Sequence, residues 1–135
     1  MSESPVLDSP EAIDAHLTAS IEPWERSNHG VRFVLCDADN QVRVHCPVDH
    51  LPPVPDPADC THAISVFAKA LVEREGGDGA MLVVLTRPGS SGVSDPDRVW
   101  FHTAYRVCRE LGVRLIGVHL MTPADQRRIL LDDAL

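Results

Sequence analysis

The stretch Met81-Leu82-Val83-Val84-Leu85 is an unbroken apolar run. A strand with one wet face alternates polar and apolar residues, so a continuous run predicts a strand that is covered on both faces. We therefore place residues 81–85 in the middle of a sheet. Downstream, residues 113–120 predict another strand, and between the two lies an amphipathic helix that begins after Ser94 and ends at Gly112. This order predicts a right-handed parallel crossover.

Upstream, two short segments rich in β-branched and apolar residues predict a β-hairpin. They are Val31 to Cys36 and Gln41 to Cys46. In the second segment we expect Val42, Val44 and Cys46 to share the core face, with Gln41, Arg43 and His45 on the other. The residues between the two segments, Asp37-Ala38-Asp39-Asn40, are of types that favour turns. A proline-rich crossover, Pro47 to Pro57, leads away from the hairpin, because proline cannot continue a sheet ladder.

Three further helices are predicted from an oxygen-bearing cap followed by proline, which fits the first helical position. The caps are Ser9, Asp56 and Thr122, and the helices run to Ser20, to Gly76 and, from Pro123, to Ala134. The predicted fold class is α/β, with the order αββαβαβα. Residues 1–30 form a helix and a connection, and residues 31–135 form a single domain. Its central mixed sheet combines the N-terminal hairpin with the parallel β-α-β crossover and is flanked by helices.

Composition excludes several classes of protein. The formal net charge of -8 opposes binding to a phosphate backbone, so nucleic acid is not an expected partner. No apolar run reaches the roughly 18 residues of a membrane span, and Met1 to Pro5 lacks the basic start of a secretory signal. We expect a soluble, cytoplasmic protein with four reduced cysteines. Eleven of the 12 basic residues are arginine, which indicates an actinobacterial type of source.

The end of the central strand carries one family resemblance. It reads Leu85-Thr86-Arg87-Pro88, and Ser94-Asp95-Pro96-Asp97 follows after a short loop. From Val31 to Met121 the order of elements resembles a JAMM (MPN) domain, with the bacterial RadC-type members as the nearest comparison. Those enzymes have His-x-His-Pro and then Ser-x-x-Asp, and the two histidines and the aspartate hold zinc. The resemblance places Leu85 and Arg87 at the histidine positions and Asp97 at the aspartate.

Leu85 and Arg87, in place of the two histidines, remove the zinc chemistry that the resemblance implies. Catalytic zinc needs three protein ligands and a water, but Leu85 has no donor atom and Arg87 is a permanent cation. The family also uses an early glutamate as general base, and no glutamate lies between Arg26 and Val72. We predict no metal, no cofactor and no catalytic residue. The hypothesis is a non-enzymatic module, a metal-free JAMM-like pseudo-enzyme that acts as a partner-binding or regulatory domain and contacts another protein or a second copy.

The alternative is a small-ligand or anion-binding protein, or an enzyme, that uses the loop from Arg87 to Ser94. Ligands collect beyond the carboxyl ends of strands in sheets of this kind. The candidate binding residues are Arg87, Ser90, Ser91, Ser94 and Asp97. The simpler interpretation of Ser94 and Asp97 is a capping box at the start of a helix.

Other chemistry-bearing residues suggest no site. The set His45, Cys46, His50, Cys60 and His62 lacks metal-ligand spacing, and neighbouring strand residues point to opposite faces. Cys36 and Cys108 fall on predicted core faces, where thiols are inert. Trp24 and Trp100 are interpreted as packing anchors, with Trp24 docking the connection before the hairpin.

Overall fold

The central apolar run forms β3 (Ala80–Thr86), and all seven of its residues are buried. In the computed structural model, which describes residues 5–135, the sheet has five strands in the order β2-β1-β3-β4-β5. β1 (Gly30–Cys36) pairs with β3 antiparallel, and β4 (Arg114–Met121) pairs with it parallel. The predicted α/β class, mixed sheet and central strand are confirmed.

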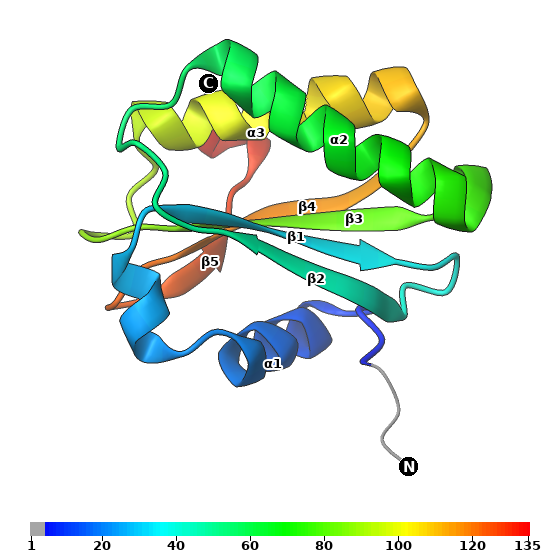
Figure 1. Ribbon diagram of the computed structural model, residues 1–135. Coiled ribbons are helices and arrows are strands. Elements are labelled where there is room, and N and C mark those ends of the chain that lie inside the picture. Colours follow the sequence, from blue (N-terminus) through cyan, green and yellow to red (C-terminus); the bar gives the residue numbers. More distant parts are fainter. Residues whose placement is uncertain (1–4) are drawn as a thin grey trace.

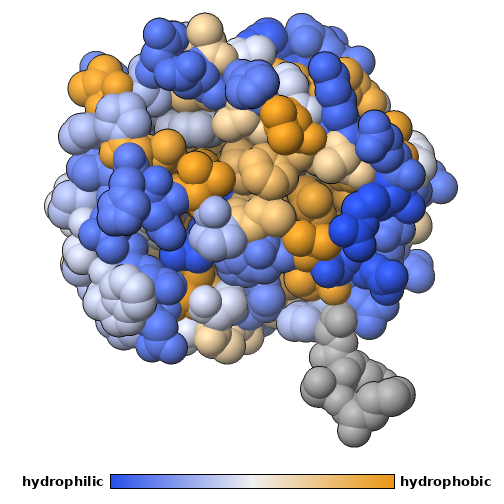
Figure 2. Space-filling view, viewed as in Figure 1, coloured by the Kyte–Doolittle hydropathy of each residue, from blue (hydrophilic) through white to orange (hydrophobic). Residues whose placement is uncertain are grey.

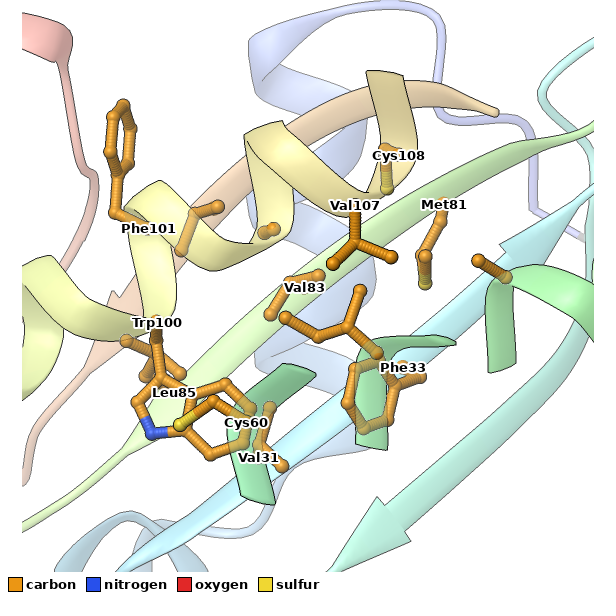
Figure 3. Close-up of a cluster of buried hydrophobic side chains, with 14 of the residues drawn as sticks. Val31, Phe33, Cys60, Met81, Val83, Leu85, Trp100, Phe101, Val107 and Cys108 are labelled. Atoms are coloured by element: carbon orange, nitrogen blue, oxygen red, sulfur yellow. The ribbon is translucent and has the colours of Figure 1, made fainter. Parts of the chain in front are cut away.

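Helices cover both faces of this sheet, which explains why its central strands are apolar throughout. α2 (Pro57–Glu75) and α3 (Asp95–Leu111) lie on one face, and α1 (Pro10–Ser20) lies on the other (Figure 1). Figure 3 shows the α2–α3 side, where Phe33 and Val83 of the sheet approach Val107 of α3. The α1 side has its own core, built from Ile13 and Leu17 of the helix and from alternate residues of the strands. Leu7 and Ile21, on either side of α1, belong to the same core.

The predicted hairpin forms, with β2 (Val42–Val48) as an edge strand beside β1. A bulge follows Leu35, which pairs with Val44, whereas Cys36 pairs with Val42. An extra residue in one strand changes the face that its neighbours occupy. Val42 therefore packs on the α1 side, while Val44 and Cys46 pack on the α2–α3 side, contrary to the simple alternation expected for all three.

The caps at three helix starts are confirmed by their hydrogen bonds. The Ser9 hydroxyl accepts from the Ala12 N–H at 3.1 Å, and the Asp56 carboxylate accepts from the Ala58 N–H at 2.8 Å. Ser94 caps α3, which ends at Gly112 in the left-handed conformation with φ of 72°. A side chain disfavours that conformation, so glycine sets the end of the helix.

The predicted last helix, from Pro123 to Ala134, is wrong. Thr122 and Asp125 exchange backbone hydrogen bonds in a tight turn, β5 (Gln126–Arg128) pairs antiparallel with β4, and only a short 3-10 turn, η3 (Leu131–Ala134), follows. The residue types that start a helix also make turns. The outer edge of the buried strand β4 needs hydrogen-bond partners. Residues 126–128 supply them, so this segment forms a strand and not a helix.

Trp24 does not dock the connection before β1, because 67% of it is exposed. That connection contains the short 3-10 turn η1 (Pro23–Ser27). It is held instead by Glu25, whose carboxylate lies 3.3 Å from Arg32 of β1, a buried cation. Trp100 is buried, as predicted.

Two predictions concern the cell compartment. Within residues 5–135 no helix has the length and apolar character to cross a bilayer. The expectation that no secretory signal begins the chain depends mainly on residues 1–4, which lie outside the described residues.

Candidate functional site

The loop after β3 brings together the residues that the sequence singled out. Arg87 directly follows β3, and Asp97 lies in the first turn of α3, so the β3–α3 crossover sets them side by side. The Arg87 side chain is 14% exposed and that of Asp97 is 4% exposed. An ion pair with so little exposure to solvent is strong, because few water molecules compete for its hydrogen bonds.

The Arg87 guanidinium is fully engaged within the protein. Its Nε–H points at both carboxylate oxygens of Asp97, at 3.1 and 3.2 Å, and Nη2 donates to Asp97 at 2.8 Å. Nη1 donates to the carbonyls of Pro88 and Ser90, and Nη2 also donates to the carbonyl of Gly92. All five N–H groups of an arginine are thus accounted for. No donor of Arg87 remains for an external anion.

Asp97 and Ser94 form the predicted capping box. The Ser94 hydroxyl accepts from the Asp97 N–H at 3.3 Å, and the Asp97 carboxylate accepts from the Ser94 N–H at 2.9 Å. Both groups satisfy backbone donors at the helix start that would otherwise lack partners. Asp97 therefore serves the helix and the guanidinium together.

The other two candidate residues lie at the rim of the loop. Ser90 is exposed and contributes its carbonyl to Arg87, whereas the Ser91 hydroxyl donates to Asp125 at 3.2 Å. That contact joins the loop to the turn between β4 and β5. The structure brings Arg87, Ser94 and Asp97 together, and the side-chain hydroxyls of Ser90 and Ser91 make no hydrogen bond to these three residues among the described contacts.

Little space remains beside the engaged residues. The cavity at this place measures about 30 Å³, and Leu85, Arg87 and Asp97 all contribute to its wall. Prolines of the crossover between β2 and α2 close its other side, namely Pro52, Pro53 and Pro55. Ligand pockets usually measure about 300–1,000 Å³, so this cavity is too small for an organic ligand.

The described residues hold no group of three or more histidine, cysteine, aspartate or glutamate side chains that could bind a metal ion. All four cysteines are free. The pKa of Cys36 and that of Cys108 are both raised to about 12, mainly by burial, and at Cys36 the charge of Asp37 contributes to this increase. These thiols remain protonated at neutral pH and are poor nucleophiles.

A second polar region, which the sequence reasoning did not identify, lies under α1. A cavity of about 290 Å³ opens between the start of α1 and strands β4 and β5. His119 of β4 is part of its wall, is only 4% exposed, and has two buried ring nitrogens with no hydrogen-bond partner. Burial lowers the pKa of His119 to about 4, so the ring is neutral at pH 7. A signal was present, because Gly117 and His119 interrupt an otherwise apolar strand on one face.

The chain matches no protein-family model and no curated protein.

Proposed function

We propose that this protein is a non-enzymatic binding module, built on a JAMM-like frame in which an arginine takes the place of the metal. The observation that carries the proposal is the Arg87 guanidinium, held by Asp97 and three loop carbonyls. In the zinc enzymes that the loop resembles, the corresponding aspartate holds a cation of another kind. Here the positive charge is supplied by the chain itself.

Two properties of this loop support a role without catalysis. A catalytic metal site keeps one coordination position open for water or substrate. The Arg87–Asp97 pair leaves no such position, and the adjoining cavity of about 30 Å³ admits little more than a water molecule. A second candidate function, an anion-binding loop, is not favoured, because every guanidinium donor already has an acceptor.

The metal-free frame makes a direct prediction. The purified wild-type chain is expected to contain no stoichiometric zinc, and neither zinc nor a chelator is expected to change its Tm. The double variant Leu85→His and Arg87→His would place two imidazoles on the side of β3 where Asp97 of α3 lies. We expect it to bind one zinc ion and to gain thermal stability, because binding to the folded state stabilises it.

The single variant Arg87→His, with one imidazole fewer, is the matched control and should bind zinc more weakly. Elemental analysis, calorimetric zinc titration and thermal unfolding followed by circular dichroism measure these outcomes. Stoichiometric zinc in the wild type would contradict the metal-free proposal. A folded double variant with no zinc affinity would contradict the JAMM-like frame.

Binding through a surface is supported by an apolar area between α2 and β2. Figure 2 shows apolar residues gathered on the face where β2 lies between α2 and α1. Val44 and Cys46 of β2 and Phe67 of α2 are only partly buried, and Val66 of α2 is 47% exposed. Pro47 lies in the edge strand itself and has no N–H, which opposes addition of a further strand. Contact through side chains is therefore the mode that we propose for a partner.

A second copy of the chain is the partner to test first, because a twofold dimer would bring two such areas together. We expect the wild type to form a dimer in a concentration-dependent manner in sedimentation equilibrium. Val66→Asp should weaken the dimer about tenfold or more, since it buries an unpaired charge at the contact. Val54→Asp changes a residue that is 76% exposed and serves as control. A wild type that is monomeric at all concentrations would contradict self-association.

A further inference from the structure

The cavity under α1 combines a partly apolar wall, charged groups of both signs and a buried histidine. Its wall is partly apolar, with Leu7 and Ile13 from the N-terminal segment and Ile116 from β4. It also contains groups of both charges, Asp14 of α1 and Arg128 of β5. The buried and unpartnered His119 is also part of this wall. Its pKa is lowered mainly by burial; the charge of Asp14 raises it and that of Arg128 lowers it.

Arg128 is an exposed residue of the cavity wall, and its guanidinium has no acceptor among the described residues. Its guanidinium makes no hydrogen bond or ion pair with any residue of the range 5–135, unlike that of the neighbouring Arg127, which pairs with Asp133. It lies against Gly117, where an added Cβ would be 3.2 Å from Nε and 3.4 Å from Cζ. Glycine inside a strand commonly marks a place where another group approaches closely. Here that group is the cation of Arg128.

Asp14, an exposed residue of α1, is held in place by a residue of β5. Its carboxylate and its backbone carbonyl accept from the Gln126 amide at 3.3 and 3.4 Å. The Gln126 oxygen in turn accepts from Arg26 at 3.0 Å. No ion pair joins Asp14 to Arg128 among the described residues, although both are part of the wall of one cavity. Opposite charges that share a cavity without pairing suit a ligand that carries both charges.

We propose that this cavity binds a small aliphatic amino acid in its zwitterionic form. The carboxylate of the ligand pairs with Arg128, its ammonium pairs with Asp14, and its side chain lies against Ile13 and Ile116. The neutral ring of His119 forms part of the wall beside the ligand. The volume of about 290 Å³ is at the small end of the usual range for ligand pockets, which fits a ligand of this size. The site is separate from the Arg87 loop, so this inference does not depend on the proposed function.

Leucine and two analogues test the charge requirement. The analogues are 4-methylpentanoate, which lacks the amine, and 3-methylbutylamine, which lacks the carboxylate. Each analogue lacks one charge-assisted hydrogen bond, so it should bind at least about tenfold more weakly than leucine. Calorimetric titration of the full chain gives the affinities, and NMR of the His119 ring protons reports the location.

Three variants test the location. Arg128→Gln and Asp14→Asn should each weaken leucine binding about tenfold or more, since each removes one charged partner. Gly117→Ala changes no charge but displaces the Arg128 guanidinium, and should also weaken binding. Arg109→Gln, at an exposed arginine of α3, is the control and should bind leucine like the wild type.

Some results would overturn the proposal. One is the absence of binding at millimolar leucine, together with its absence for each of the other aliphatic amino acids. Equal affinity for leucine and 4-methylpentanoate would reject the zwitterionic ligand. Leucine binding that survives in folded Arg128→Gln would reject the cavity. Loss of folding in one variant does not prevent the test, because Gly117→Ala and the ligand analogues give independent results.

Discussion

Replacement of Asp97 by alanine is expected to lower the free energy of unfolding by about 3–5 kcal/mol, the usual effect of removing one partner of a buried ion pair. The loss is large because the carboxylate serves three donors, Arg87 Nε, Arg87 Nη2 and the Ser94 N–H. Without it, a cation that is 86% buried has only carbonyls as partners, and α3 loses half of its capping box. Urea unfolding followed by circular dichroism measures the difference.

Asp95→Ala provides the matched control in the same helical turn. The Asp95 side chain is 95% exposed and pairs with Arg98 on the surface, so its loss should change stability by less than about 1 kcal/mol. Equal stability of Asp97→Ala and the wild type would contradict the structural role of the Arg87–Asp97 pair. Adding Arg87→Leu to Asp97→Ala should destabilise less than the two separate effects combined, because neither charge is then left unpaired.

Acid is expected to destabilise the protein through His119 by ~3 kcal/mol between pH 6.5 and pH 4. Burial is the main cause, because it lowers the pKa of this histidine from 6.5 to about 4. The unfolded chain therefore binds the proton first as the pH falls. The contribution to stability is complete above pH 6.5 and is lost as the pH approaches 4.

The variant His119→Gln isolates this effect, since it cannot titrate. Between pH 6.5 and pH 4 the free energy of unfolding of this variant should fall by ~3 kcal/mol less than that of the wild type. His62→Gln, at an exposed histidine of α2, should retain the wild-type pH dependence. An identical acid response of His119→Gln and the wild type would show that the ring is not buried as a neutral group. Burial also lowers the pKa of His16 and of His45, so some acid sensitivity should remain in every variant.

Much of the fold followed from local patterns. The apolar run of β3, the turn before β2 and the caps of α1, α2 and α3 each depend on residues close together in the chain. Such signals act over a few residues, and their physical basis is the same in a peptide and in a folded protein. The Ser94–Asp97 capping box was likewise interpreted from sequence, and both of its hydrogen bonds are present.

The errors arose where distant segments decide the outcome. The chain after Thr122 has the residues of a helix start, but β4 needed a partner along its outer edge and recruited Gln126 to Arg128. The bulge after Leu35 moved Val42 to the α1 side. Trp24 is of a residue type that often anchors a loop, yet the ion pair of Glu25 with Arg32 holds the connection before β1.

The sequence by itself determined the class of fold, the central strand and the helix starts, because these depend on periodicity and on backbone hydrogen bonds near each residue. It also showed that neither Leu85 nor Arg87 can be a zinc ligand, since the donor atoms of a side chain are known from its type. Only the tertiary structure decided what Arg87 does, because its five acceptors belong to a loop and a helix that meet through folding. The same holds for the cavity of His119, whose wall joins α1 to β4 and β5, segments about a hundred residues apart.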